Sequence, residues 1–275
     1  MEVVMLDPEA VEMNLLTEAI YEQYGLDFRR YAVSSLWRRV TERMQQENLA
    51  TISGLQEKIL HDVSCMERLA SDISINVTSL FRDPGFYGAF REKIVPLLKT
   101  YPFIRIWHAG CATGEEVYSL AILLKEENLL DRCLIYATDM NEPIIEKAKS
   151  GIFPLASMKE YTRNYLKAGG KGTLSDYYTA KYDSAIFNQS LVKNTVFSRH
   201  NLAMEWSFNE FNVILCRNVM IYFNSELQEK VHDLLAESLC RFGFLGIGNM
   251  ESMAYCPHKT AFEAIDSHHK LYRKV

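Results

Sequence analysis

The sequence predicts a doubly wound α/β sheet of the Rossmann-like type, preceded by a small all-helical domain and interrupted by a small β-rich insertion. From residue 102 onward, short apolar runs alternate with segments of helical periodicity, the pattern of parallel strands joined by helices. Residues 1–75 have helical periodicity and no convincing strand, and residues 169–200 break the later alternation. We therefore expect a helical domain at 1–75, a linker at 76–95 and a sheet domain at 96–275, with the insertion near 169–200.

The helical domain is predicted from one apolar face and from its turns. Val33, Leu36, Val40 and Met44 stand three and four residues apart, which places them on one side of a helix. Glycines at 25 and 54 punctuate the region, as expected for short helices joined by turns.

The sheet domain is predicted element by element from apolar runs and helix signals. Buried strands are expected at 103–110, 134–139 and 211–218, with later candidates at 244–248 and 270–275. Helices are expected at 115–127, 143–151 and 225–243, the last with Ser225 as its cap. Within the insertion, a GGKGT turn precedes the two strand-like segments YYTAKY and LVKNTVF.

Composition bounds the class of protein. The chain has 275 residues, 48% apolar and 24% charged, so it can bury a full core. No apolar run has membrane-spanning length and the acidic start is unlike a signal peptide, so we expect a cytoplasmic protein that does not insert into membranes. A net charge of −5 argues against a general nucleic-acid binder. The six cysteines and seven histidines form no C-x-x-C or H-E-x-x-H pattern, so no metal site is predicted.

A glycine-containing turn follows the first predicted strand. It reads HAGCATGEE at 108–116, a G-x-x-x-G spacing that differs from the motifs that bind pyrophosphate. Asp139 ends the next predicted strand, where an acid can accept hydrogen bonds from ribose hydroxyls. A nucleoside without a diphosphate, such as S-adenosylmethionine (AdoMet), fits both features. An ordinary strand-to-helix turn, or the ribose acid of an NAD-binding fold, remains an alternative at this point.

Four segments together resemble one known family. They are NVTSLFR at 76–82, RIWHAGCATGEE at 105–116, ATDMN at 137–141 and CRNVMIYF at 216–223. In order and spacing they are similar to the CheR family, which methylates glutamate side chains of chemotaxis receptors. The resemblance covers nearly the whole chain. It implies an AdoMet-dependent protein-glutamate O-methyltransferase that produces glutamate methyl esters and S-adenosylhomocysteine in sensory adaptation.

The resemblance also implies roles for individual residues. The linker motif that closes over the methyl donor is matched by Asn76, Thr78 and Arg82, and the acid that recognises the amino group of the methionine portion by Glu116. The ribose is expected at Asp139 and the adenine against Met140. Further cofactor-binding positions are expected at Gly110, Asn201, Leu202, Arg217 and Asn218. The residues implied to lie nearest the methyl-transfer centre are Arg82 and Tyr222.

Three positions depart from the family pattern. Leu80 replaces the first of two common phenylalanines, His108 stands where serine is frequent, and residues 241–243 replace a Pro or Gly-Gly turn. None of these changes removes a residue that the resemblance assigns to chemistry.

The implied reaction needs alignment more than acid–base chemistry. A free glutamate has a pKa of ~4.3, so at neutral pH it is already the nucleophile and needs no general base. The guanidinium of Arg82 has a fork of donors that can fix one carboxylate oxygen and leave the other to attack. Tyr222 can donate a hydrogen bond that sets the approach angle. Each of these residues also has a purely structural interpretation. Arg82 can be a surface arginine and Tyr222 a core aromatic residue, and Glu116 can be a carboxylate that complements the positive N-terminus of its helix.

A basic helix suggests an acidic partner. Arg38, Arg39 and Arg43 follow Arg29 and Arg30 in a chain of net negative charge. The expected partner is the cytoplasmic helical region of a receptor, whose methylation helices carry clustered glutamates. A solvated helix face is the simpler alternative, and nucleic acid is disfavoured by the overall charge. We expect a monomer.

Two other functions compete with receptor methylation. One is an AdoMet-binding regulatory module without turnover, which would be marked by the loss of Arg82 or Tyr222, and both are present. The other is a small-molecule methyltransferase on the same fold, for which the basic helix would be superfluous.

Overall fold

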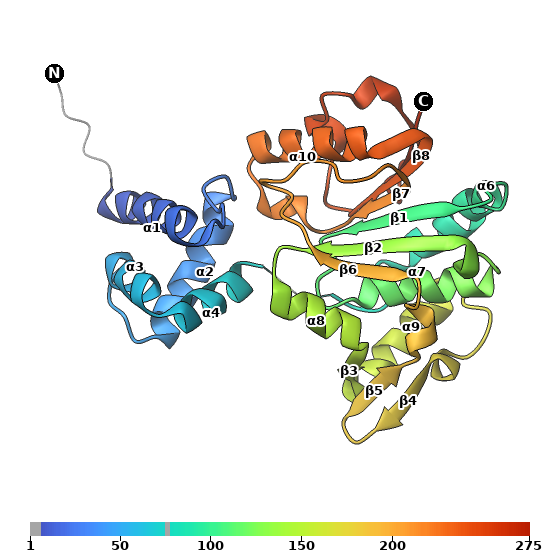
Figure 1. Ribbon diagram of the computed structural model, residues 1–275, viewed down its shortest axis with the longest axis horizontal. Coiled ribbons are helices and arrows are strands. Elements are labelled where there is room, and N and C mark those ends of the chain that lie inside the picture. Colours follow the sequence, from blue (N-terminus) through green and yellow to red (C-terminus); the bar gives the residue numbers. More distant parts are fainter. Residues whose placement is uncertain (1–6, 75–77) are drawn as a thin grey trace. The chain divides into compact units, whose positions relative to one another are not determined.

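A computed structural model describes residues 7–74 and 78–275, which form two compact units (Figure 1). The helical unit contains Met1–Ile75 together with Tyr222–Gln228, and the α/β unit contains Asn76–Ile221 and Glu229–Val275. Within the described residues, no helix is both long and apolar enough to cross a bilayer.

The helical unit holds α1 (Pro8–Tyr24), α2 (Val33–Gln46), α3 (Ile52–His61) and α4 (Val63–Ile73). Three of these four helices begin at a side chain that accepts backbone N–H groups: Asp7 at α1, Thr51 at α3 and Asp62 at α4. Helix α1 is capped at its C-terminus by Gly25, whose φ of 67° is one that glycine adopts easily. α1 packs on α3 and α2 on α4, around Leu16, Val40, Leu55 and Leu69. The all-helical prediction is confirmed.

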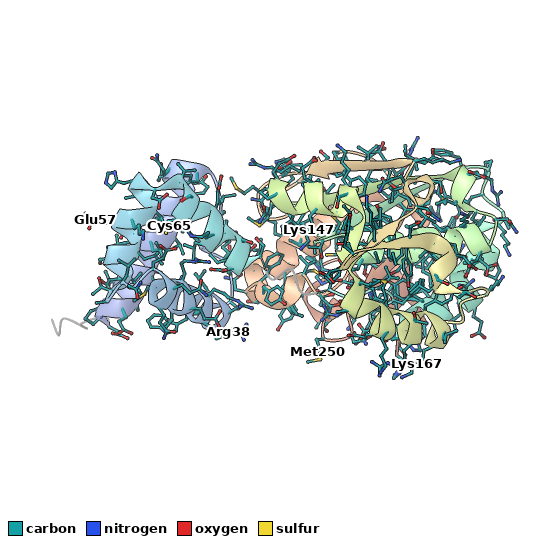
Figure 2. The ribbon with its side chains drawn as sticks, turned by 90° about the horizontal axis from the view of Figure 1, so that it is seen from below. Arg38, Glu57, Cys65, Lys147, Lys167 and Met250 are labelled. Carbon is teal, nitrogen blue, oxygen red and sulfur yellow. The ribbon has the colours of Figure 1, made fainter. Side chains whose placement is uncertain are left out.

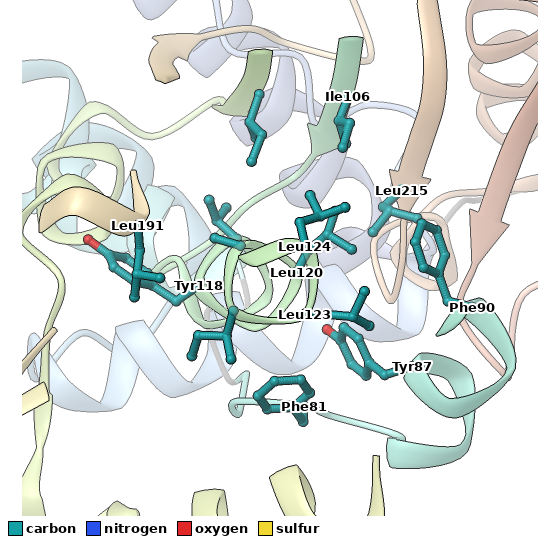
Figure 3. Packing of buried hydrophobic residues seen from close by; sticks show 14 of the residues in the cluster. Phe81, Tyr87, Phe90, Ile106, Tyr118, Leu120, Leu123, Leu124, Leu191 and Leu215 are labelled. Atoms are coloured by element: carbon teal, nitrogen blue, oxygen red, sulfur yellow. The ribbon is translucent and has the colours of Figure 1, made fainter. Parts of the chain in front are cut away.

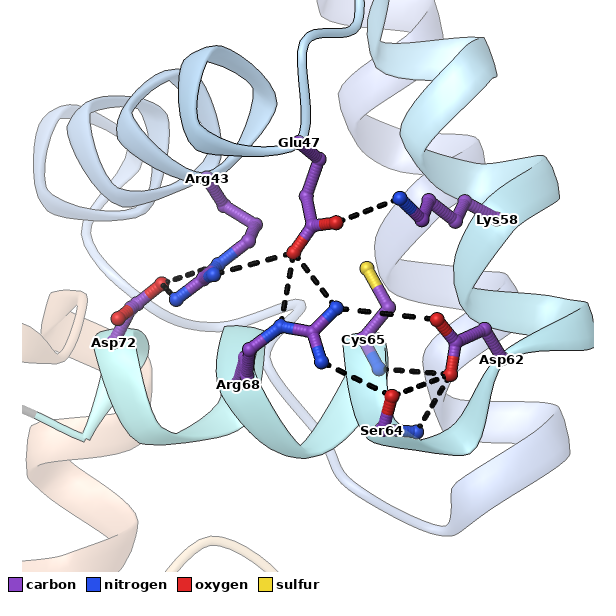
Figure 4. Close-up of polar contacts among 8 residues, drawn as sticks. All are labelled: Arg43, Glu47, Lys58, Asp62, Ser64, Cys65, Arg68 and Asp72. Carbon is purple, nitrogen blue, oxygen red and sulfur yellow. Dashed lines mark hydrogen bonds and ion pairs between the residues drawn. The ribbon is translucent and has the colours of Figure 1, made fainter.

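The buried face of α2 differs from the predicted one. Leu36 and Val40 are buried, but Val33 is 73% exposed, and the third buried position of the helix is Arg43. Arg43 forms ion pairs with two acids: its Nη2 lies 2.6 Å from Asp72 Oδ2, and its Nη1 lies 3.3 Å from Glu47 Oε1 (Figure 4). A charge is tolerated at this position because acids on both sides pair with it.

Glu47 is the centre of this polar network. Hydrogen bonds from Lys58, at 2.7 Å, and from Arg68, at 2.9 Å, lower its pKa to about 2 (Figure 4). Three cations from three helices therefore converge on one carboxylate, and Arg43 belongs to the internal structure of the helical unit.

The α/β unit is built on a seven-stranded sheet in the order β6-β2-β1-β7-β8-β10-β9. The strands are β1 (Ile104–Ala109), β2 (Cys133–Asp139), β6 (Thr195–Arg199), β7 (Phe211–Cys216), β8 (Leu239–Ile247), β9 (Phe262–Asp266) and β10 (Leu271–Lys274). The first five pair in parallel, and β10 is antiparallel to both β8 and β9. The chain goes from β1 outward to β2 and β6, then returns to the other side of β1 as β7, so the order reverses between β1 and β7. Loops at such a reversal form the usual ligand crevice of an open α/β sheet.

Helices cover the sheet on both faces (Figure 1). These are α7 (Glu115–Glu126) after β1, α8 (Glu142–Ser150) after β2 and α10 (Ser225–Ser238) after β7. Before β1, the chain forms α5 (Pro84–Ala89), a π-helical turn at Phe90–Ile94 and α6 (Val95–Leu98). Aromatic side chains from the linker, including Phe81, Tyr87 and Phe90, pack with α7 and β1 in the main core (Figure 3). The doubly wound prediction is confirmed.

Several boundaries differ from the predicted ones. The helix predicted at 225–243 ends at Ser238, and its last five residues begin β8, in which Leu239 pairs with Phe211 of β7. A second, three-stranded sheet is present in the order β3-β5-β4, from β3 (Ile152–Pro154), β4 (Tyr178–Lys181) and β5 (Ser184–Phe187). It lies with α9 (Met158–Lys167) between β2 and β6 in the chain. The strand expected in LVKNTVF is instead β6, at the edge of the large sheet.

Candidate functional site

The predicted glycine turn connects β1 to α7 at the carboxyl end of the sheet. Gly110 has φ 82°, and a Cβ built there would lie 2.5 Å from Val219 Cγ2 in the loop after β7. Gly114 has φ 96°, and its Cβ would lie 2.9 Å from the Ala148 backbone in α8. Both positions therefore need glycine, because a side chain would strain the backbone and collide with a neighbouring segment.

Asp139 ties this turn to the end of β2. Its Oδ2 accepts a hydrogen bond from the N–H of Ala112 at 3.1 Å, and its Oδ1 accepts from Asn141 at 3.2 Å. Burial raises the pKa of Asp139, and the backbone donors around it oppose that shift. A carboxylate has about four acceptor positions, so this one keeps capacity for hydroxyl donors.

The other predicted nucleoside positions lie around the same strand end. Met140 follows Asp139 and is half-buried. Strand β6 pairs with β2, and the N–H of His200 donates to the backbone oxygen of Asp139 at 3.0 Å. This brings the buried pair Asn201 and Leu202 to the edge that holds Asp139. The Asn201 side chain accepts from Ala203 N–H at 3.0 Å, which shapes the turn.

An ionic chain around the buried Arg217 stands beside the glycine turn. Glu116, in the first turn of α7, accepts from Arg217 Nη1 at 2.9 Å, and its other oxygen lies 3.0 Å from His108 Nδ1. Arg217 Nη2 lies 2.9 Å from Asp83 Oδ2, and the guanidinium lies 4.0 Å from the Phe86 ring centre. Burial by itself would raise the pKa of Glu116, but the His108 hydrogen bond and the Arg217 charge outweigh it and the pKa is lowered. Glu116 is therefore held as a carboxylate.

The same arginine anchors the linker that carries Arg82. Arg217 Nη2 donates to the backbone oxygen of Arg82 at 3.2 Å, and Phe81 N–H donates to Ser119 Oγ at 2.7 Å. The backbone of Arg82 is thus fixed next to Glu116. Thr78 is half-buried in the linker, and Asn76 lies outside the described residues.

The loop after β7 is supported by a residue that the sequence did not indicate. Asn218 has φ 60°, a left-handed conformation. Glu251 accepts hydrogen bonds from Val219 and Met220 N–H groups at 2.8 Å, and also from Gly248 N–H. Burial raises the pKa of Glu251, against these backbone donors. The available clue was an acid three residues after the predicted strand 244–248.

Tyr222, which was predicted to lie near the methyl-transfer centre, belongs to the helical unit. Tyr222 ends a short 3₁₀ turn, and its carbonyl accepts from Ala32 N–H at 2.8 Å. Its place beside the reacting groups stays a prediction.

The predicted basic surface must be corrected. Arg43 is buried in ion pairs with Glu47 and Asp72, so it does not present its charge to a partner. Arg29 pairs with Asp27 and Glu18, and Arg30 with Glu226. Arg38 projects from the surface of α2 with a side chain 59% exposed (Figure 2). Arg39, 21% exposed, shares Glu42 with it. Of the predicted basic residues of α2, Arg38 and Arg39 therefore stay available to a partner, with Glu42 between them.

These groups fit a nucleoside that carries an amino acid. Asp139 offers acceptors for ribose hydroxyls, and Glu116 offers a carboxylate for an ammonium group. Asp139 ends β2, and Glu116 lies in the first turn of α7, directly after the turn that follows β1; that turn has no motif for pyrophosphate.

Comparisons with known proteins agree with this chemistry. Residues 76–271 match the model described as CheR methyltransferase, SAM binding domain, and residues 12–74 match CheR methyltransferase, all-alpha domain. A Pseudomonas putida protein that carries the name methyltransferase Cher3 is 46% identical over 264 residues, 96% of this chain and 97% of that protein. The chemotaxis protein methyltransferase of Listeria monocytogenes is 28% identical over 239 residues, 86% of this chain and 88% of its own. The chain thus belongs to the CheR methyltransferase family, with AdoMet as its methyl donor.

Proposed function

We propose that this chain transfers the methyl group of AdoMet to glutamate side chains of chemotaxis receptors, forming methyl esters. In this step a glutamate oxygen bonds to the methyl carbon while the methyl–sulfur bond breaks and its electron pair stays on sulfur. No proton moves. The observation that carries the proposal is the anchoring of Arg82: its carbonyl accepts from Arg217, which also pairs with Glu116.

This anchoring suits a carboxylate acceptor. Arg217 holds the Arg82 backbone 3.2 Å away, so the side chain of Arg82 extends from a fixed point beside the methionine end of the donor. A guanidinium so placed can bind one oxygen of the incoming carboxylate and leave the other aligned with the methyl group, at roughly 3–3.5 Å. The site needs no general base, because the acceptor is ionised at neutral pH.

The direct test is label transfer. The protein is incubated with AdoMet labelled in the methyl group and with receptor-containing membranes, and the receptor is then treated with mild base. We expect label on the receptor that base releases as volatile methanol, and none on a receptor whose acceptor glutamates are replaced by glutamine. Label that resists base, or transfer to small acceptors only, would overturn the glutamate assignment.

The cofactor part is tested through Asp139. In calorimetry, Asp139→Ala should weaken AdoMet and S-adenosylhomocysteine by roughly 1.5–3 kcal/mol, because bonds from ribose hydroxyls to a charged acceptor are lost. Glu142→Ala, which removes an exposed acid from the start of α8, is the matched control and should bind normally. Equal affinity of Asp139→Ala and wild type would remove Asp139 from the site, and preferential binding of NAD would contradict the methyltransferase assignment.

The partner part is tested on the corrected surface. Arg38→Ala with Arg39→Ala should raise the KM for receptor by about twofold to thirtyfold, since each of the two exposed contacts contributes ~0.2–1 kcal/mol. AdoMet affinity should not change, and added salt should reproduce the effect, because the Debye length is only ~8 Å at physiological ionic strength. Arg29→Ala, whose charge is already paired with Asp27, serves as control. If the double variant has unchanged receptor kinetics at low salt, this face of α2 is only solvated and does not bind the receptor.

A further inference from the structure

His108 is a buried polar side chain at the centre of the sheet with no role in the function proposed above. It is fully buried near the end of β1, and its neighbours across the sheet are Ala137 in β2 and Leu215 in β7. Its Nδ1 lies 3.0 Å from Glu116 Oε1. Because a carboxylate only accepts hydrogen bonds, Nδ1 carries the proton and the ring is the donor.

We propose that His108 is a positioning residue that orients the Glu116 carboxylate toward the ammonium group of the methyl donor; this inference rests on the proposed function of the same site. Glu116 is clamped at both oxygens, Oε1 by His108 and Oε2 by Arg217. The two clamps use two of about four acceptor positions, which leaves the others for a cationic ligand. The Glu116 side chain is 16% exposed, whereas His108 is fully enclosed, so His108 acts only through Glu116.

The clamp has an energetic reason. A free glutamate side chain at the mouth of a site populates several rotamers, and each must be frozen when the ligand binds. A hydrogen bond from a rigid ring inside the sheet removes that freedom beforehand.

The test compares two ligands that differ at the amino-acid end. S-adenosylhomocysteine carries the ammonium and carboxylate groups; 5′-methylthioadenosine keeps the adenosine and the sulfur but lacks both. By calorimetry, His108→Leu, which keeps volume but removes the donor, should weaken S-adenosylhomocysteine by about tenfold. Its affinity for 5′-methylthioadenosine should stay within about twofold of the wild-type value. His108→Asn, which restores a donor, should recover most of the lost affinity.

A double-mutant cycle with Glu116→Gln separates positioning from general support of the fold. If His108 acts through Glu116, His108→Leu should cause no further loss for S-adenosylhomocysteine once Glu116 is replaced. Equal weakening of both ligands by His108→Leu, or an unchanged affinity for both, would overturn the inference. If the wild type itself binds the two ligands equally, the assignment of Glu116 in the proposed function fails instead, which keeps the two failures distinct.

Discussion

Arg82→Ala is expected to lower methyl-transfer turnover by about a hundredfold to a thousandfold, the effect of losing an alignment contact of ~2.7–4 kcal/mol. The loss should fall on turnover and not on receptor affinity, because the guanidinium is proposed to align the carboxylate in the transition state. The substitution also preserves the hydrogen bond that anchors the backbone at this position. The bond from Arg217 goes to the backbone oxygen of Arg82, which alanine retains.

The controls for Arg82 separate alignment from charge. Arg82→Lys keeps the charge but lacks the planar two-donor fork, so it should rescue only partly. Tyr222→Phe keeps the ring and removes one hydroxyl, so the rate should fall more modestly. AdoMet affinity must be measured in each variant, because the linker is implied to contact the donor as well. Wild-type turnover in both Arg82→Ala and Tyr222→Phe at saturating substrates would show that the chemistry runs through other residues.

Most of the sheet was predictable because parallel strands are buried on both faces. Such strands are mostly apolar, as in 104–109 and 211–216, and they stand out against the periodic helices between them. The segment 239–243 was assigned to a helix because its apolar spacing continues that of α10. The segment belongs to β8, which pairs with β7 at Leu239 and again from Phe244 onward, and these long-range contacts are not visible from local sequence. The edge strand β9, at Phe262–Asp266, was missed because it is only half-buried and weakly patterned.

The site was predictable where a residue type carries its own chemistry at a strand end, as Asp139 does. Partners supplied by distant segments were not predictable. Asp83 lies 134 residues before Arg217 in the chain, and Glu251 lies 32 residues after Val219. The error at Arg43 was avoidable: it stands three residues after Val40 and seven after Leu36, so the helical period already places it on the buried face.

Arg217→Met is expected to destabilise the α/β unit by about 3–5 kcal/mol, because it removes a buried guanidinium and leaves two partly buried carboxylates without their counter-ion. The arginine side chain is 1% exposed and lies between Glu116 and Asp83, with both acids 2.9 Å away. Denaturant unfolding would measure the loss through Trp107, which is fully buried in β1. Trp37 belongs to the helical unit, so a Trp37→Phe background keeps the two units apart in the fluorescence signal.

A charge-matched variant distinguishes the uncompensated acids from lost packing over the Phe86 ring. If the cost of Arg217→Met comes from the acids, adding Glu116→Gln and Asp83→Asn should restore much of the stability, because neutral side chains no longer need a counter-ion. If it comes from packing, the triple variant should be as unstable as Arg217→Met. A loss below about 1 kcal/mol for Arg217→Met would instead place this ionic chain in the range of exposed surface pairs. In that case Arg217 would not be the anchor that holds Arg82 beside the methyl donor.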